Sequence, residues 1–251
     1  MSDLWRAALA VLTIFGASFS TAGAAPKFVA ESVAIRDVDT GFYLYRKNSG
    51  QSRAPASTIK VLSALTAFDL EKDLDRYVKI SRRAATMEPT SAQMKAGEEY
   101  RLIDLLSAML IGSCNDAAAA LAEGISGSES KFAEAMTAHA RRLGAENTRV
   151  TNASGLPTPA GMVVTAEDSL LFVEALKNST KLADIFASRQ FVLKSRDGRH
   201  LSIRNHNRLL WNYEYPVRGK TGYTRLAQHC FLSYATYKGR TISVSILGSK
   251  K

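Results

Sequence analysis

Residues 228–248 read Gln-His-Cys-Phe-Leu-Ser-Tyr-Ala-Thr-Tyr-Lys-Gly-Arg-Thr-Ile-Ser-Val-Ser-Ile-Leu-Gly. Two runs rich in aromatic and β-branched residues, Gln228–Tyr237 and Arg240–Gly248, flank a Lys-Gly turn, which is typical of paired antiparallel strands. The second run alternates, with Ile and Val on one side and Thr and Ser on the other. This pattern predicts a strand in a sheet whose Ser/Thr face is fairly polar.

The N-terminal part of the chain carries a second strand signal. Ser32–Val38 alternates, and a turn separates it from another short strand at Phe42–Arg46. Helical spacing fills the middle of the chain, at Ser57–Leu70, Leu102–Ile111, Asp116–Glu123, Lys131–Leu143 and Thr165–Lys177, where Thr165 is the expected cap. This order predicts an α+β fold, with an antiparallel sheet formed from both termini and an inserted helical lobe.

Composition excludes several classes of protein without identifying one. The 251 residues are 46% hydrophobic and 22% charged, as in an ordinary globular protein. The chain has 33 Lys and Arg and 23 Asp and Glu, which gives a net charge of +10. This charge favours anionic surroundings such as nucleic acid, anionic lipid or cell-wall polymer. The 2 cysteines are too few for a disulfide scaffold or a four-cysteine zinc site.

The first 25 residues resemble an export signal. Arg6 precedes an apolar run from Ala7 to Phe19, and Ala22-Gly23-Ala24 offers small residues for cleavage. We therefore expect residues 1–24 to be a signal peptide, residues 25–251 to form a single domain, and the protein to be exported to the periplasm, cell envelope or medium. An uncleaved N-terminal anchor is the alternative, but the run is short for a permanent span, and no permanent membrane anchor is expected.

Ser57-Thr58-Ile59-Lys60 lies at the start of a predicted helix. Because residues three apart share a helix face, Lys60 can reach the Ser57 hydroxyl. A serine becomes nucleophilic when a base takes its proton, and a desolvated lysine near other cations can lose its charge and act as that base. We expect Arg218 and Lys220 to be such cations. By itself the motif is also compatible with a capping serine and an exposed lysine.

Two other short motifs carry groups suited to the same chemistry. Ser113-Cys114-Asn115 interrupts two predicted helices, where Ser113 can relay a proton and Asn115 can hold a carbonyl or orient the lysine; an ordinary N-cap is the alternative. Lys220-Thr221-Gly222 precedes the last strands. Lys220 and Thr221 can bind a carboxylate and Gly222 lets a substrate backbone approach, whereas the alternative is a surface lysine beside a turn.

Together the three motifs are much more specific. They occur as Ser-x-x-Lys, Ser-x-Asn and Lys-Thr-Gly, each in its expected context, which is the signature of penicillin-recognising serine enzymes. Over residues 28–248 the chain resembles the low-molecular-mass penicillin-binding proteins, in particular D-alanyl-D-alanine carboxypeptidases and their D,D-endopeptidase relatives. Other stretches share this resemblance: Arg53–Ser57, Gly97–Glu98, Asp104–Leu106, Asn115–Ala118, Asn152–Leu156, Thr165–Asp168, Asn207–Trp211 and Gly219–Thr224.

The resemblance implies a role for each group of the site. Ser57 would attack the carbonyl of the penultimate D-Ala of a peptidoglycan stem peptide, and Lys60 would accept its proton. Ser113 would pass a proton to the departing amine while Asn115 positions the peptide. The oxyanion would lie between the backbone N–H groups of Ser57 and Tyr223.

Substrates, inhibitors and partners also follow from the resemblance. Lys220 and Thr221 would engage the terminal carboxylate, beside Gly222. β-Lactams would acylate Ser57 as covalent inhibitors, and neither a metal nor an organic cofactor is required. Stem peptides are the expected partners, anionic wall or envelope polymers are compatible with the basic surface, and no nucleic-acid fold signature is present.

Some features depart from the family pattern or leave alternatives open. The family continues past the last strand with a helix, whereas this chain ends at Lys251, so we expect no C-terminal β-domain or anchor helix, and a barer sheet face on the Ser/Thr side of the last strand. An endopeptidase or a non-catalytic binder remains open. A β-lactamase is disfavoured because no Glu-x-x-Leu-Asn stretch follows the second motif. Cys114 and Cys230 are expected to remain unpaired thiols.

Overall fold

The computed structural model describes residues 28–215 and 217–250. The predicted signal peptide, residues 1–24, lies outside the described residues. None of the described helices is long and apolar enough to cross a membrane.

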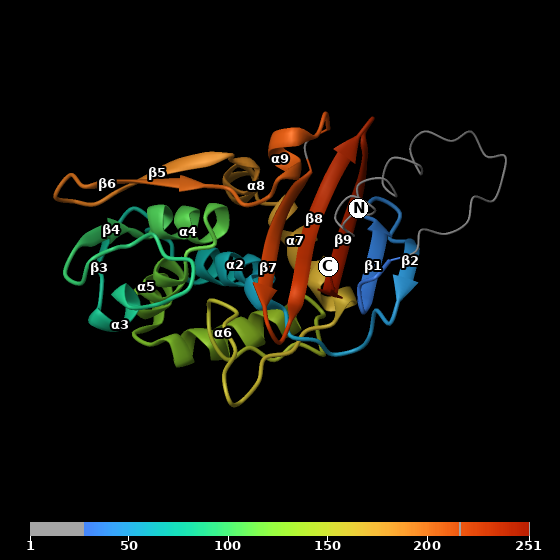
Figure 1. Ribbon diagram of the computed structural model, residues 1–251, viewed down its shortest axis with the longest axis horizontal. Helices are drawn as coiled ribbons and strands as arrows, with labels where there is room; N and C mark the ends of the chain where they lie inside the picture. Colours follow the sequence, from blue (N-terminus) through green and yellow to red (C-terminus); the bar gives the residue numbers. More distant parts are fainter. Residues whose placement is uncertain (1–27, 216, 251) are drawn as a thin grey trace.

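A five-stranded antiparallel sheet joins the two ends of the described chain, as the sequence predicted. Its order is β2-β1-β9-β8-β7, with β1 at Ser32–Asp37, β2 at Tyr43–Lys47, β7 at Arg218–Thr224, β8 at Gln228–Tyr237 and β9 at Arg240–Ser249. Figure 1 shows the N-terminal β1 beside the C-terminal β9. Their register pairs Val33 with Ile246 and Ile35 with Val244, so apolar side chains lie opposite one another on one face.

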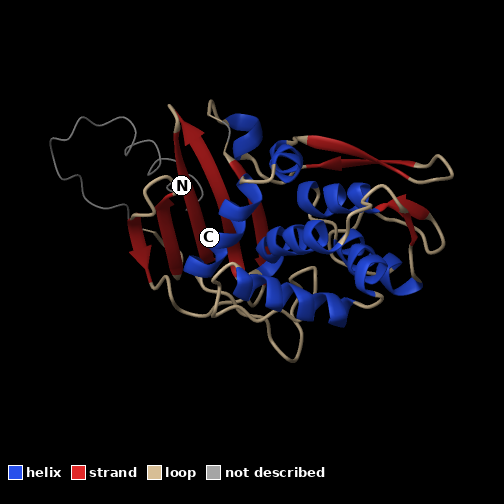
Figure 2. Ribbon diagram, turned by 180° about the vertical axis from the view of Figure 1, so that it is seen from behind, coloured by secondary structure: helices blue, strands red, loops and turns tan. Residues whose placement is uncertain are grey.

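The helices gather on one side of this sheet and extend beyond it (Figure 2). Each predicted helix is present within a few residues of its expected bounds. The helices of the described residues are α2 (Lys60–Leu70), α3 (Arg82–Ala85), α4 (Leu102–Ile111), α5 (Asn115–Ser126), α6 (Glu129–Arg142), α7 (Ala166–Lys177), α8 (Thr180–Ala187) and α9 (Leu209–Asn212), with a 3₁₀ turn η1 (Ala56–Ile59) before α2. Thr165 caps α7 as predicted, because its hydroxyl accepts a hydrogen bond from Asp168 N at 2.9 Å.

Two small two-stranded sheets were not predicted. β3 (Tyr77–Lys79) pairs with β4 (Glu99–Arg101), and β5 (Gln190–Lys194) pairs with β6 (His200–Arg204). The first has only three residues per strand, too few for a periodic signal. The second alternates but buries one residue per strand, Leu193 and Ile203, against the helical lobe. Six of its ten side chains are exposed, and all of these except Val192 are basic or polar.

The expectation of a barer Ser/Thr face on the last strand is wrong. Thr241, Ser243 and Ser245 are at most 2% exposed, because α7 packs over them. Ser243 Oγ donates to Glu174 Oε1 of α7 at 2.6 Å, and the same carboxylate pairs with Arg36. The small hydroxyl-bearing side chains leave room for a helix, and the face is polar because it binds a buried carboxylate.

The opposite face of the sheet carries a second hydrophobic cluster. Ile242, Val244 and Ile246 of β9 pack there with Phe231 of β8 and Val33 of β1. Both faces of the central strands are therefore buried. The edge strand β7 contacts η1 and α8 of the helical lobe.

Ser245 provides a test of this packing. Its hydroxyl is buried and has no hydrogen-bond partner within the described residues, so it bears a desolvation cost without compensation. Ser245→Ala should raise the free energy of unfolding in urea by about 1 kcal/mol. Ser243→Ala, which removes a donor to Glu174, should lower it by about 1–2 kcal/mol. Equal destabilisation by both substitutions would contradict this assignment.

Candidate active site

The three motifs converge where η1 and α2 meet the edge strand β7. Ser57 lies in η1, and Lys60 begins α2, one turn later. Lys60 Nζ donates to Ser57 Oγ at 2.9 Å. Ser57 is half-buried, whereas Lys60 is fully buried, so the lysine is presented to the hydroxyl from the protein interior.

Asn115 joins the second motif to the lysine. Its Oδ1 accepts a hydrogen bond from Lys60 Nζ at 2.6 Å, and its Nδ2 donates to the carbonyl of Pro89. An amide nitrogen carries two hydrogens, so one remains for a further acceptor. The neighbouring Asp116 is fully buried and accepts hydrogen bonds from Ala92 N and Met94 N, which fixes the 89–94 loop beside the site.

Ser113 lies between α4 and α5, just before Asn115, and makes no hydrogen bond to Lys60. It is 6% exposed and has a left-handed backbone (φ 60°), which is unusual for serine. Among the described residues its hydroxyl has no hydrogen-bond partner. The strained backbone holds Ser113 next to Asn115, and the unused hydroxyl can bond with a substrate group.

The third motif is held against the nucleophile by a glycine. A Cβ added to Gly222 would lie 2.9 Å from Ser57 N and 3.1 Å from Thr58 N, so only glycine lets β7 approach this closely. Tyr223 follows it, with its ring exposed and 4.6 Å from that of His229. The Ser57 backbone therefore lies beside β7, the strand that also carries the backbone amide of Tyr223.

Lys220 and Thr221 precede this glycine on β7. Lys220 is 2% exposed, and its Nζ donates to Thr221 O at 2.9 Å. No carboxylate pairs with Lys220 among the described residues. A buried cation without a counter-ion favours binding of an anion.

Sequence reasoning missed one member of the site, the backbone carbonyl of Ser154. It accepts a hydrogen bond from Lys60 Nζ at 2.7 Å. The loop is shaped by Asn152 Oδ1, which accepts from Gly155 N at 2.8 Å. Gly155 has φ +86°, and a Cβ there would lie 2.0 Å from Ala56 O. The conspicuous glycine in this stretch was the available signal, although a role played by a backbone carbonyl leaves no side-chain pattern.

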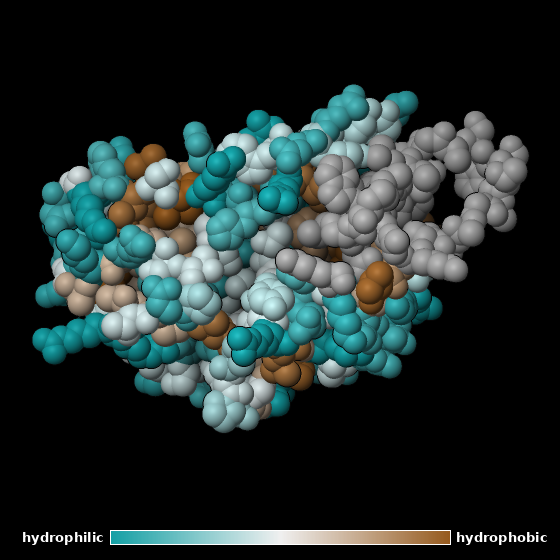
Figure 3. Space-filling view, in the orientation of Figure 1, coloured by the Kyte–Doolittle hydropathy of each residue, from teal (hydrophilic) through white to brown (hydrophobic). Residues whose placement is uncertain are grey.

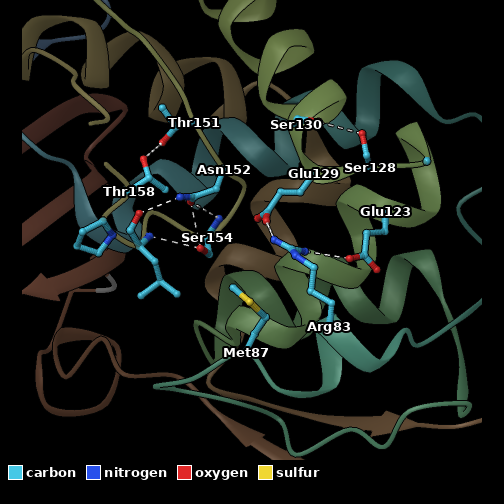
Figure 4. A pocket seen from close by; sticks show the side chains of 13 residues that line it. Arg83, Met87, Glu123, Ser128, Glu129, Ser130, Thr151, Asn152, Ser154 and Thr158 are labelled. Carbon is cyan, nitrogen blue, oxygen red and sulfur yellow. Dashed lines mark hydrogen bonds and ion pairs between the residues drawn. The ribbon is translucent and has the colours of Figure 1, made fainter. Parts of the chain in front are cut away.

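Glu129 supports this loop from behind. Its Oε1 accepts from Ala153 N at 3.0 Å, and its other oxygen pairs with Arg83, which also binds Glu123 at 2.9 Å. Figure 4 shows Arg83 between the two carboxylates, across a cavity of about 580 Å³ from Asn152. This network fixes the position of the carbonyl that Lys60 contacts.

Burial lowers the pKa values of both lysines, and repulsion by Lys220 lowers that of Lys60 further. Burial holds the pKa of Lys60 well below its usual 10.5, and the charge of Lys220 lowers it further. Burial lowers the pKa of Lys220 to about 7. The predicted effect of a neighbouring cation on Lys60 is confirmed for Lys220, and Lys60 can be neutral, as a general base must be.

The two cysteines are free and buried, and burial raises their pKa values to about 12 for Cys114 and about 11 for Cys230. Neither thiol is therefore a nucleophile at neutral pH. Within the described part of the chain, no cluster of three or more His, Cys, Asp or Glu side chains is arranged to hold a metal ion.

Comparisons with known proteins agree on one family. The family model described as D-alanyl-D-alanine carboxypeptidase matches residues 19–251. A D-alanyl-D-alanine carboxypeptidase of Mycobacterium tuberculosis is 34% identical over 88% of this chain and 76% of its own length. One from Bacillus subtilis is 32% identical over 87% of this chain, which spans 57% of that relative.

A D-alanyl-D-alanine endopeptidase of Pseudomonas aeruginosa is 29% identical over 86% of this chain and 70% of its own length. The crystal structure of a D-alanyl-D-alanine carboxypeptidase from Mycobacterium tuberculosis superimposes with a TM-score of 0.85 at 32% identity, covering 93% of this chain and 89% of that one. The predicted fold class is confirmed by this match.

Gly155 offers a test of the close approach between its loop and the backbone carbonyl of Ala56. Gly155→Ala would push a Cβ into Ala56 O, next to the nucleophile, so we expect a loss of several kcal/mol in unfolding free energy or a displaced Ser57. Gly144→Ala is the matched control, since Gly144 has φ +87° but no close contact and should lose only about 1 kcal/mol. Similar urea midpoints for the two variants would contradict the assigned contact.

Lys220 makes stability depend on pH. Between pH 7 and 10.5 it holds a proton in the unfolded chain but has lost it in the folded one, so unfolding free energy should rise with pH by about 1.4 kcal/mol per unit in this window. Lys220→Met should lower the slope of unfolding free energy against pH by that amount, measured by urea unfolding at pH 7.5 and 9, and leave the contribution of Lys60, whose pKa is also lowered. The exposed Lys181→Met should retain the full slope, and an unchanged slope in Lys220→Met would refute the shift.

Proposed function

The chain belongs to the D-alanyl-D-alanine carboxypeptidase family, and from this premise we propose that it is a serine-type carboxypeptidase that hydrolyses the terminal D-Ala–D-Ala bond of peptidoglycan stem peptides. The observation that carries the proposal is the hydrogen bond from buried Lys60 to Ser57 Oγ, beside the Gly222 segment of β7. A non-catalytic binder would have no need for a buried lysine of lowered pKa at a serine.

Acylation begins with the neutral lysine. Lys60 takes the Ser57 proton, and Oγ forms a bond with the carbonyl carbon of the penultimate D-Ala. The backbone N–H groups of Ser57 and Tyr223 stabilise the resulting oxyanion. The C–N bond then breaks, the amine of the last D-Ala receives a proton through Ser113, and an ester remains on Ser57.

Deacylation uses water. Lys60 takes a proton from the water, whose oxygen attacks the ester carbonyl, and Ser57 leaves with a proton while the shortened peptide gains a carboxylate. A β-lactam follows the same first steps, but its leaving group stays tethered, so the ester on Ser57 persists.

Substrate recognition rests on the cation of β7 and the amide of α5. The terminal carboxylate binds at Lys220 and Thr221, where it supplies the counter-ion that Lys220 lacks among the described residues. Asn115 donates its remaining amide hydrogen to a backbone carbonyl of the peptide.

The family acts on the cell wall, which supports the proposal that this site meets its substrate outside the cytoplasm. We propose that residues 1–24 are an export signal and that residues 25–251 act as one domain in the periplasm or cell envelope. The +10 charge favours retention near anionic wall or envelope polymers.

Labelling with a fluorescent penicillin tests the nucleophile. The protein should form a covalent adduct and release D-Ala from a pentapeptide, and Ser57→Ala should abolish both while Ser52→Ala, an exposed serine nearby, retains both. Lys60→Met should slow acylation by at least about 10³-fold because the base is lost. Labelling of Ser57→Ala, or a folded wild type that releases no D-Ala, would overturn the assignment.

A further inference from the structure

The turn that carries Ser113 places its glycine at an unexpected position. α4 ends at Gly112, and Ser113 follows with a left-handed backbone (φ 60°). The residue in this conformation after a helix is usually glycine, because a side chain there is strained. Here the glycine comes one residue earlier, at φ −89°, a conformation that other residues also adopt. Backbone freedom therefore does not explain Gly112.

The side chain of Ile203 in β6 explains this glycine. A Cβ added to Gly112 would lie 2.4 Å from Ile203 Cγ2 and 2.9 Å from Cys114 Sγ. Carbon atoms in ordinary contact are about 3.5–4.0 Å apart, so a side chain at position 112 would overlap the Cγ2 methyl. Gly112 therefore leaves room for that methyl to pack directly against its backbone.

The hairpin β5–β6 brings this methyl to the turn. Ile203 and Leu193 are its two buried side chains, and both belong to the main hydrophobic core. Figure 1 shows the two strands beside α4, which both of them contact. Figure 3 shows mainly hydrophilic residues, with a few hydrophobic ones, on the part of the surface where the hairpin lies. The hairpin therefore faces solvent with its outer residues and packs on the helical lobe with its inner ones.

The hydrogen bonds of the turn itself restrain Ser113 weakly. Cys114 N donates to Ala108 O at 3.4 Å, which is longer than a usual N–H···O hydrogen bond. The Ser113 hydroxyl has no hydrogen-bond partner among the described residues. A serine keeps a left-handed backbone only where its surroundings leave it no other arrangement. The packing of Ile203 on Gly112 supplies this restraint from outside the turn.

We propose that Ile203 is a positioning residue for the reaction, because its Cγ2 methyl holds Gly112 in place and thereby directs the Ser113 hydroxyl toward the leaving amine. The inference rests on the proposed function, in which Ser113 passes a proton to the nitrogen of the last D-Ala as the C–N bond breaks. Ile203 acts only through the turn. Without its methyl, Ser113 relaxes toward the usual negative φ, and a displacement of about 1 Å can slow a reaction step by ~10²-fold.

Exchanges between similar apolar side chains test the methyl. Ile203→Leu keeps the number of buried carbon atoms but leaves a single carbon on Cβ, so the contact with Gly112 changes. We expect kcat/KM for D-Ala release from a pentapeptide to fall at least about 10-fold. Ile203→Val keeps Cγ2 and should stay within about twofold of the wild type. Leu193→Ile, the reverse exchange at the other buried position, is the matched control and should also stay within about twofold. Urea unfolding should show that all three variants fold.

The leaving group shows which step the methyl affects. In a thioester analogue of the pentapeptide, sulfur replaces the nitrogen of the last D-Ala, and the C–S bond breaks with its electron pair on sulfur. A thiolate can leave without a proton, whereas an amine nitrogen needs one. We expect Ile203→Leu, like Ser113→Ala, to lose at least about 10-fold in kcat/KM with the amide and to stay within about threefold with the thioester. A substitution that merely distorts the site would slow both substrates.

The outcomes separate the inference from the function on which it rests. An unchanged amide rate in Ile203→Leu, equal losses of that variant on the two substrates, or an equal loss in Ile203→Val or Leu193→Ile would overturn the inference and leave the carboxypeptidase intact. Equal losses of Ser113→Ala on both substrates would overturn the inference together with the proton transfer assigned to Ser113. A wild type that hydrolyses neither substrate and is not labelled by penicillin would overturn the proposed function instead.

Discussion

The site depends on one fully buried lysine amine with three oxygen partners. Lys60 Nζ contacts Ser57 Oγ, Asn115 Oδ1 and Ser154 O, at 2.6–2.9 Å, and these come from three separate segments of the chain. Burying a lysine is unfavourable, and the acceptors offset that cost only when all three segments are in place. The same burial lowers the lysine's pKa, so the interaction that assembles the site also prepares its base.

Two glycines determine how closely the segments approach. Gly155 lies against Ala56 O on one side of the nucleophile, and Gly222 lies against Ser57 N on the other. A Cβ at Gly155 or Gly222 would lie 2.0 Å or 2.9 Å from the backbone of η1, so either segment would have to move away. The short 3₁₀ turn therefore lies between the loop that contains Gly155 and β7, the edge strand of the sheet.

Much of this arrangement could be predicted from the sequence, and the exceptions have physical causes. Alternation and helical spacing identified the main sheet and the principal helices, since burial of one face imposes those periods. The polar face of β9 was misjudged because Ser243 and Ser245 are covered by a helix whose Glu174 uses a serine hydroxyl, which strand periodicity does not show. The carbonyl of Ser154 and the hairpin β5–β6 were missed because backbone acceptors and short exposed strands leave weak patterns.

The two buried lysines need opposite charge states, although burial lowers the pKa of both. Lys60 must be neutral to accept a proton, whereas Lys220 must be charged to hold a carboxylate. With a pKa of about 7, Lys220 is balanced between its two states in the free protein, and an arriving carboxylate raises that pKa because an opposite charge favours the protonated form. The ammonium so formed then repels a proton on Lys60, although the carboxylate partly offsets that repulsion. The substrate therefore sets the protonation of the group that binds it, and the base retains the low pKa that its own burial imposes.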